Sequence, residues 1–231
     1  MMEILTEEQL RELQDRWRTS SAETILSESI SLFGKDSISF ATALGIEGIV
    51  ILHHLYKMNA GIEIFLLDTE LLFPETYALK EHIEKTFGLK IKTYRGISLK
   101  DQEEIFGKNL WYRNPDLCCF IRKVLPLKKA LDGKKAWITS IRREQSPSRA
   151  TAETIMWDNK NNLYKVNPLA YWTWEQVWDY VKKHNLPYNP LHDKGYPSIG
   201  CMPCTTPVAE GEEWRAGRWR GLQKTECGIH Q

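Results

Sequence analysis

The stretch SISFATALGIEGIVILHHLYKMNAGIEIFLLDT, residues 37–69, decides the fold class. Residues 37–42 form a short β-prone run that ends in small residues, and residues 46–56 have the composition of an apolar helix. Glu63–Leu67 is a second apolar run of strand length. A strand, a helix and a second strand in this order predict a βαβ unit, in which the two strands are parallel.

The same alternation continues towards the C-terminus. Pro74 suits the first turn of a helix that runs to about Phe87, where Gly88 would cap it. Residues 90–94 and 136–140 are further strand candidates, and residues 122–131 are a predicted helix between them. Strands that alternate with helices of this length predict an α/β fold with a parallel sheet.

The flanking segments suggest a division of the chain into three parts. Residues 1–36 contain a predicted helix over residues 6–17, with Thr6 as its N-cap. Residues 37–204 form the α/β domain, which also includes two β-like pieces around the turn DNKNN and a helix that Thr173 would cap. Residues 205–231 are rich in Gly and Arg and are predicted to be a mobile, flexible C-terminal tail.

Charge and composition narrow the class of protein. The 231 residues carry 31 basic and 30 acidic side chains, a balance that argues against a general nucleic-acid binder. The N-terminus lacks the apolar core of a signal peptide, and no apolar run approaches the ~20 residues that span a bilayer. We therefore expect no membrane association and a cytoplasmic location, where cysteines bind metals or catalyse more often than they form disulfides.

Polar and charged residues follow three of the predicted strands directly. Because the carboxyl ends of parallel strands meet at one edge of a sheet, the loops there open a ligand crevice. The residues expected at this edge are Thr42 and Gly45, Asp68 and Thr69, and Arg142 and Arg143. Arg149 follows soon afterwards in the segment SPSRA. Guanidinium groups bind phosphate and sulfate oxygens well, although the usual fate of arginine is a solvated surface.

Four of the five cysteines form two pairs. Cys118 and Cys119 are adjacent, whereas Cys201 and Cys204 form a CxxC motif flanked by Gly200 and Pro203. Four thiolates suit tetrahedral Zn²⁺ or an iron–sulfur cluster, and adjacent ligands fit a cluster better because each can bind a separate iron. The alternative is that the adjacent pair is buried apolar packing and only the CxxC motif has a chemical role.

The fifth cysteine, Cys227, lies in the segment ECGIH near the C-terminus. His230 is close to it in sequence, and Arg215, Arg218 and Arg220 lie upstream. Cationic neighbours lower the pKa of a thiol and favour the nucleophilic thiolate, so Cys227 is a candidate nucleophile. The alternative is an exposed cysteine without a role.

Taken together, these motifs resemble the adenylyl-sulfate / phosphoadenylyl-sulfate reductase family, and most closely its bacterial iron–sulfur branch. The resemblance covers the chain from about residue 37 onwards. It rests on LDTELLFPETY (residues 67–77), CCFIRKVLPLKKAL (118–131), AWITSIRREQSPSRA (136–150), residues 167–204 with the CxxC motif, and the tail segments RAGRW and ECGIH. The resemblance implies a Rossmann-like parallel sheet of the adenine-nucleotide α-hydrolase (PP-loop) type.

The resemblance also implies an activity and its residues. Cys118, Cys119, Cys201 and Cys204 would bind one [4Fe–4S] cluster that orders the site without passing electrons to the substrate. The Cys227 thiolate would take the sulfo group from adenylyl sulfate, and thioredoxin or a similar dithiol would then release sulfite, as part of sulfate assimilation and cysteine biosynthesis. The implied substrate-binding residues are Lys123, Arg215, Arg218 and His230 around the phosphosulfate, with residues 42–45 and Asp68 and Thr69 facing the nucleotide.

The sequence departs from the family pattern at two places. Glu70 stands where the family usually has Gly, and the loop TALGIEG differs from the Ser-Gly-rich form of the iron–sulfur branch. This loop partly resembles the branch that uses the 3′-phosphorylated substrate, so phosphoadenylyl sulfate is the alternative substrate. A homo-oligomer is compatible with the sequence.

Three other functions are weighed against the reductase. An ATP-using PP-loop enzyme would need the phosphate loop SGGxDS, which is replaced here by FATALGIEG. A non-enzymatic zinc module would give Cys227 no role. A cluster-based redox sensor would contain iron but would not turn over a substrate.

Overall fold

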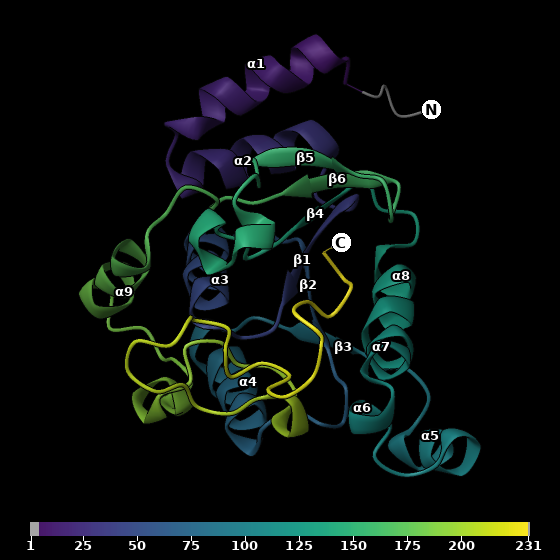
Figure 1. Cartoon of the computed structure of the whole chain (residues 1–231). Coiled ribbons are helices and arrows are strands. Elements are labelled where there is room, and N and C mark those ends of the chain that lie inside the picture. Colours follow the sequence, from purple (N-terminus) through teal and green to yellow (C-terminus); the bar gives the residue numbers. More distant parts are fainter. Residues whose placement is uncertain (1–4, 231) are drawn as a thin grey trace.

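The computed structural model describes residues 5–230. Its helices and strands are labelled in Figure 1. Along the chain they are α1 (Glu7–Arg18), α2 (Ala22–Phe33), β1 (Ile38–Thr42), α3 (Ile46–Lys57), β2 (Glu63–Leu67), α4 (Pro74–Phe87), β3 (Ile91–Tyr94), α5 (Leu99–Phe106), α6 (Leu110–Arg113), α7 (Pro115–Cys119), a π-helical turn (Phe120–Val124), α8 (Leu125–Leu131), β4 (Ala136–Ile138), β5 (Ile155–Asp158), β6 (Leu163–Val166) and α9 (Trp174–Lys183).

The strands form one six-stranded sheet in the order β3-β2-β1-β4-β6-β5. All neighbouring pairs are parallel except β5 and β6, which form an antiparallel hairpin at one edge. The predicted βαβ unit is confirmed, because β1 and β2 pair in parallel through Ser39–Glu63 and its neighbours in register. The chain moves outward from β1 to β2 and β3, then returns to place β4 on the other side of β1. The strand order therefore reverses between β1 and β4, which is where open α/β sheets form their ligand crevice.

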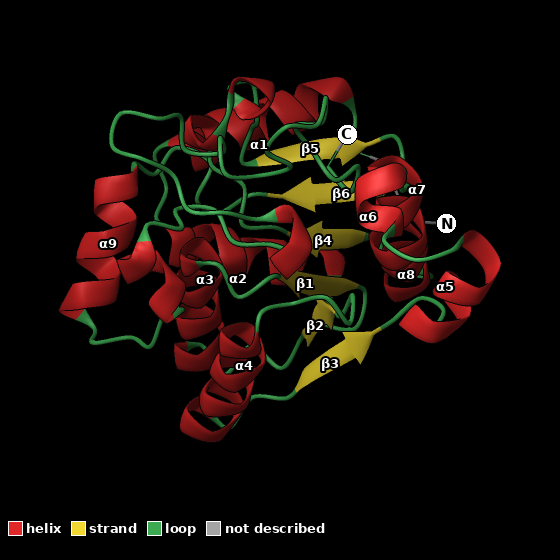
Figure 2. Ribbon diagram, turned by 60° about the horizontal axis from the view of Figure 1, so that its bottom comes forward, coloured by secondary structure: helices red, strands yellow, loops and turns green. Residues whose placement is uncertain are grey.

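Helices cover both faces of the sheet (Figure 2). Helices α3 and α4 lie on one face, and α8 lies on the other, where it packs against β2 and β3. The strands of the sheet centre are apolar on both sides, as expected for a parallel sheet covered by helices, and Phe40, Phe65 and Ile138 are fully buried.

The N-terminal helices are part of the same apolar core. Trp17 of α1 and Leu26 and Phe33 of α2 belong to the main cluster of buried side chains. The predicted N-cap is confirmed, because the Thr6 hydroxyl accepts a hydrogen bond from the Gln9 amide. The division at residues 36 and 204 stays a prediction.

The helix predicted over residues 122–131 begins earlier than expected. Pro115 starts α7, and the chain continues through the π-helical turn into α8 without leaving a helical path. Both adjacent cysteines therefore lie on a helix and not in a loop. Within residues 5–230, no helix has the length and apolar character needed to cross a membrane.

Candidate active site

A cavity of about 200 Å³ lies at the carboxyl ends of β1, β2 and β4. Three loops of the sheet contribute to its wall, and the segment after residue 196 contributes a further part of the lining. The polar and charged lining residues include Thr42, Gly45, Glu47, Thr69, Lys123, Ser140, Gln145, Arg149, Ser198, Arg215, Arg218, Glu226, Cys227 and His230. The strand-end crevice predicted from the sequence is therefore present.

The wall formed by β1 and α3 is packed closely. A Cβ atom added to Gly48 would lie 2.7 Å from the Thr42 hydroxyl oxygen, so the first turn of α3 lies directly against the end of β1. This packing leaves Gly45 at the N-cap of α3, on the cavity wall. The unpaired amides of a helix N-terminus favour anionic ligands.

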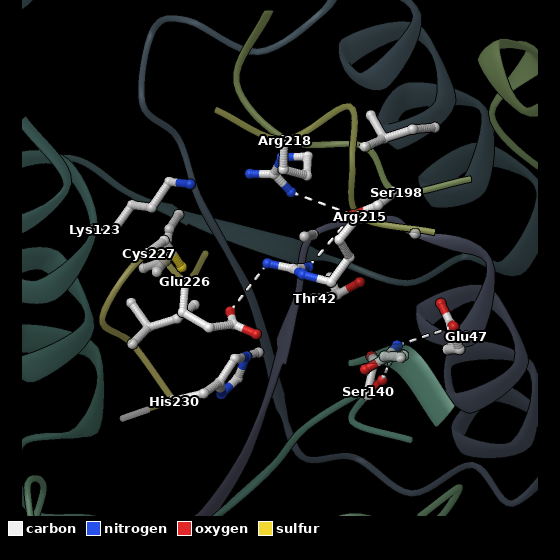
Figure 3. A pocket seen from close by; sticks show the side chains of 18 of the residues that line it. Thr42, Glu47, Lys123, Ser140, Ser198, Arg215, Arg218, Glu226, Cys227 and His230 are labelled. Atoms are coloured by element: carbon white, nitrogen blue, oxygen red, sulfur yellow. Dashed lines mark hydrogen bonds and ion pairs between the residues drawn. The ribbon is translucent and has the colours of Figure 1, made fainter. Parts of the chain in front are cut away.

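Cys227 lies on the cavity wall opposite this helix (Figure 3). Burial alone would raise the pKa of its thiol, but Lys123, the Ile229 amide and Arg218 together bring the pKa below its usual value. The same environment favours the thiolate, which is the nucleophilic form of cysteine. In contrast, burial raises the pKa values of Cys118, Cys119 and Cys204.

Cationic side chains surround Cys227. Lys123, Arg215 and Arg218 converge on the same part of the cavity from the π-helical turn and the tail (Figure 3). Both arginines donate to the Ser198 hydroxyl over 3.4 Å. Burial lowers the pKa of Arg215 to about 10, with further lowering by the nearby Arg149. Several cations held together out of water form a site for an anionic ligand.

His230 completes this end of the cavity. Its ring stacks on Trp137, with ring centroids 5.5 Å apart. Burial first and the surrounding cations second lower its pKa well below the usual value, so the ring is neutral at neutral pH. Within residues 5–230, His230 Nδ1 and Arg218 Nε are buried without a hydrogen-bond partner. Both atoms therefore keep a hydrogen-bonding capacity that no described protein group uses.

The other four cysteines surround a second, smaller cavity. Cys118, Cys119, Cys201 and Cys204 all line it, together with Arg122, Lys123 and Trp219 among others. The CxxC pair reaches this position because Met202 N donates to Leu71 O, and the Thr69 hydroxyl lies 3.3 Å from Cys201 Sγ. Within the described ranges, no three His, Cys, Asp or Glu side chains form a ready site for a single metal ion.

This second cavity fits an anionic metal centre in its donor atoms and its charge. Four thiols from two distant segments face one space, and Arg122 Nε and Nη2 are buried there without a hydrogen-bond partner in the described part of the chain. In the absence of a metal, burial raises the pKa of Cys118 to about 12. Cationic side chains beside a Cys₄ centre balance its negative charge.

A comparison with models of protein families assigns the chain to one of them. The model of the phosphoadenosine phosphosulfate reductase domain matches residues 37–207. The chain belongs to this family. Four of the five cysteines lie inside the matched range, and Cys227 lies outside it.

Curated relatives in the reductase family are similar over almost the whole chain. A protein of Anoxybacillus flavithermus named adenosine 5′-phosphosulfate reductase is 50% identical over 198 residues, which cover 85% of this chain and 84% of the relative. A protein of Gloeobacter violaceus named phosphoadenosine 5′-phosphosulfate reductase is 47% identical over 225 residues, 96% of this chain and 93% of the relative.

Solved structures confirm the predicted α/β fold of the PP-loop type. The phosphoadenylyl-sulfate reductase of Candida auris superimposes with a TM-score of 0.80 at 28% identity, over 88% of this chain and 98% of that chain. An FMN adenylyltransferase of Candida glabrata shares the fold at a TM-score of 0.59 and 18% identity, over 89% of this chain and 70% of that chain.

The structure brings most of the sequence-predicted residues of this reductase-family chain together. The cavity at the strand ends is lined by Thr42, Gly45, Thr69, Lys123, Arg215, Arg218, Cys227 and His230, and the smaller cavity is lined by the four paired cysteines. Residues 205–230 pack over the cavity without a regular helix or strand. The mobility of this tail stays a prediction.

Three of the predicted crevice residues lie elsewhere, so their expected positions were wrong. The Arg142 guanidinium is fully buried and donates to Glu47 and Glu144, and Arg143 lies over Tyr171 at the surface. The Asp68 carboxylate accepts hydrogen bonds from Tyr77 and Arg95 instead of facing the cavity. Each side chain turns towards an opposite charge or a hydroxyl close to its own strand end, which satisfies it locally.

The residues that take these places were not predicted as site residues from the sequence. Gln145 and Arg149, from the loop after β4, line the cavity, and Glu226 of the tail lines it as well. Arg149 was noticed as a basic residue, but its direction depends on two short 3₁₀ turns, Arg143–Gln145 and Pro147–Arg149. Glu226 carried a signal in the sequence, because it directly precedes the candidate nucleophile.

Proposed function

We propose that this reductase-family chain converts adenylyl sulfate (adenosine 5′-phosphosulfate) to sulfite and AMP, with Cys227 as the nucleophile. The observation that carries the proposal is a thiol of lowered pKa on the wall of a cation-lined cavity at the strand-order reversal. The reductant would be thioredoxin or a similar protein dithiol. A cytosolic setting, in which thiols stay reduced, suits both the five free cysteines and this chemistry.

The first step is the transfer of the sulfo group to Cys227. The thiolate attacks the sulfur of the bound phosphosulfate, an S–S bond forms, and the bond from sulfur to the bridging oxygen breaks. AMP leaves with the electron pair of that bond, so negative charge grows on the phosphate. Lys123, Arg215 and Arg218 line the same part of the cavity as Cys227, and fixed cations beside a developing negative charge would stabilise the transition state.

The second step returns Cys227 to its starting state. A thiolate of the dithiol attacks the Cys227 sulfur, the bond to the sulfo group breaks, and sulfite leaves with the electron pair. The second thiol of the reductant then displaces Cys227 from the mixed disulfide. The dithiol is oxidised by two electrons, and the sulfo sulfur is reduced to sulfite.

We further propose that Cys118, Cys119, Cys201 and Cys204 hold one [4Fe–4S] cluster. Their shared cavity, the tandem placement of two ligands on α7 and the unpaired nitrogens of Arg122 support this. When bound, the cluster would supply an ordered, negatively charged centre and not an electron to the substrate. Lys123 lines both cavities and would therefore balance the charge of the cluster as well as that of the substrate.

Phosphoadenylyl sulfate is the second candidate substrate. The Gloeobacter violaceus relative and the Candida auris structure bear its name, whereas the Anoxybacillus flavithermus relative bears that of adenylyl sulfate. On the side of the cavity formed by Glu47 and Ser140, the Glu47 carboxylate accepts hydrogen bonds from Arg142 and Gln145, and Arg149 donates to Gln145. Because this side contains both charges, the preference for adenylyl sulfate rests on the two cysteine pairs, which resemble those of the iron–sulfur branch.

The test is sulfite release under anaerobic conditions with reduced thioredoxin and each sulfonucleotide in turn. We expect sulfite with adenylyl sulfate, less with the 3′-phosphorylated form, and none from Cys227→Ser. Iron and acid-labile sulfide would be measured on the same samples, with four of each per chain expected. Sulfite release by the Cys227→Ser variant would refute the role of Cys227, and zinc in place of iron would refute the cluster.

A further inference from the structure

Glu226, the residue before Cys227, is a buried carboxylate held by two arginines. Its side chain is 2% exposed. Arg149 donates to both of its oxygens, with Nε–Oε1 and Nη2–Oε2 distances of 2.9 Å each. Arg215 donates to Oε2 over 3.1 Å, and the Ser148 hydroxyl lies 3.4 Å from Oε1. A two-point contact of this kind fixes orientation as well as distance.

The contact to Arg149 joins the tail to the body of the protein. Arg149 and Glu226 are 77 positions apart, and Arg149 belongs to the loop that follows β4. Arg215, in contrast, lies within the tail and also donates to the Thr225 carbonyl. Glu226, the residue next to the nucleophile, therefore links the tail to the loop that follows β4.

The other polar anchors of this segment are more exposed. Lys224 pairs with Asp116, whose side chain is 83% exposed, and Lys160 donates to the Gly228 carbonyl near the surface. Exposed ion pairs contribute little to stability, whereas removing one partner of a buried pair leaves an uncompensated charge. The contacts of Glu226 are thus the polar restraint on the tail around Cys227 in which both partners are buried.

We propose that Glu226 is a positioning residue that holds the tail closed through Arg149 and Arg215 and so places Cys227 for the sulfo transfer. This inference rests on the proposed function. The same sulfur must be enclosed while it attacks the substrate and accessible when a protein dithiol attacks it. Loss of the Glu226 contacts would therefore slow the first half-reaction and would not slow the second.

Arg149 and Arg215 can contact the substrate as well as Glu226. Both line the cavity, so a phosphosulfate bound beside Cys227 presents its negative charge to groups that already hold the Glu226 carboxylate. A bound phosphosulfate and the Glu226 carboxylate would therefore share Arg149 and Arg215. Glutamine at position 226 keeps the shape of the side chain but removes its negative charge and one of its two acceptor oxygens, so it weakens the restraint without creating a gap.

The test variant is Glu226→Gln, and the matched control is Glu212→Gln. Glu212 lies in the same tail and also makes a two-point contact with an arginine, Arg220, but it lies outside the cavity. We expect adduct formation on Cys227 in a single turnover to slow by about tenfold or more in Glu226→Gln, because small displacements of a nucleophile are costly. Discharge of the preformed adduct by thioredoxin should be as fast as in the wild type or faster. The control should leave both rates unchanged.

A double-mutant cycle with Arg149→Gln separates positioning from direct binding of substrate. If Glu226 acts through Arg149, the double variant forms the adduct no more slowly than the slower single variant. Fully additive losses, or equal losses in both half-reactions of Glu226→Gln, would overturn the proposal.

Hydrogen exchange of residues 222–230 in the substrate-free protein gives an answer that does not depend on activity. We expect faster exchange in Glu226→Gln than in the wild type, with the Glu212→Gln control unchanged. Unchanged exchange in Glu226→Gln would overturn the restraint even if the wild type formed no adduct. If the wild type formed no adduct but exchange were faster in Glu226→Gln, the proposed function would be refuted. The restraint by Glu226 would still stand.

Discussion

At the scale of single residues, Gly200 directly precedes the CxxC motif and lies against Arg218, one of the cations that line the cavity. An added Cβ atom would overlap the guanidinium group of Arg218, far inside van der Waals contact. Arg218 is held there between the Gly200 backbone, the Ser198 hydroxyl and the Trp219 ring. A side chain at position 200 therefore cannot be added without moving a cavity cation.

We predict that Gly200→Ala impairs function more than stability. The guanidinium is the end of a flexible chain and can move, so the free energy of unfolding should change by less than about 1 kcal/mol. Adduct formation on Cys227 should slow by about tenfold, because Arg218 no longer reaches the substrate. Denaturant unfolding and single-turnover kinetics measure the two effects. An unchanged rate would show that the position of Arg218 is not important.

The lowered pKa of Cys227 predicts how the first step depends on pH. Only the thiolate attacks, so the rate of adduct formation should rise with pH through this pKa and then level off. Lys123 is the largest influence that lowers the pKa, acting against burial. In Lys123→Met the rising limb should therefore move to higher pH.

Lys128→Met is the control for this pH profile. Lys128 is an exposed residue of α8, so its removal takes away a positive charge without changing the cavity. The position of its rising limb should match that of the wild type. A Lys123→Met profile that only decreases in height, without moving along the pH axis, would argue against this account of the thiol.

At the scale of elements, helices α3 and α9 enclose a buried histidine. His54 of α3 lies 4.9 Å from the Tyr180 ring of α9, and within residues 5–230 both of its ring nitrogens lack a hydrogen-bond partner. Burial, with smaller contributions from His53, Lys57 and His184, lowers its pKa from 6.5 to about 4. The neutral ring is therefore the form that packs between these helices.

This packing predicts a loss of stability in mild acid. Because the pKa of His54 is lower in the folded protein than in the unfolded chain, the unfolded chain binds more protons below pH 6.5, and stability falls as the pH approaches 4. From pH 7 to pH 5 the contribution amounts to about 2 kcal/mol. Denaturant unfolding measures this effect. Between pH 7 and pH 5, the free energy of unfolding of the wild type should fall by about 2 kcal/mol more than that of His54→Leu.

His82→Leu is the matched control, because His82 is an exposed residue of α4. It should follow the pH dependence of the wild type. Equal pH dependence in the wild type and in His54→Leu would contradict the buried neutral ring.

The sequence predicted the elements best where the signals were local. The strands β1 and β2 and the caps of α1 and α9 follow from runs and cap residues that lie next to one another. The helix around the adjacent cysteines was predicted to start too late, because Pro115 begins a short helix that continues through a π-helical turn. The position of the hairpin β5–β6 beside β4 depends on long-range pairing and not on local sequence.

At the scale of the whole molecule, the site combines three loops of the sheet with the C-terminal tail. The cysteines, Lys123 and the tail arginines were predicted because motifs mark them. The pairing of Glu226 with Arg149 and of Arg142 with Glu47 could not be predicted, since each joins segments far apart in the chain. A position at a strand end fixes the edge of the sheet on which a residue lies, but not the direction in which its side chain points.

The central claim is that Cys227 takes the sulfo group from the substrate within this cavity. The most direct test mixes the purified protein anaerobically with adenylyl sulfate in the absence of any reductant and follows intact and peptide masses. We predict one added sulfo group on the peptide that contains Cys227, one AMP released per chain, and loss of the group when reduced thioredoxin is added. A protein that contains four irons per chain but gains no sulfo group from adenylyl sulfate or its 3′-phosphorylated form would contradict the account.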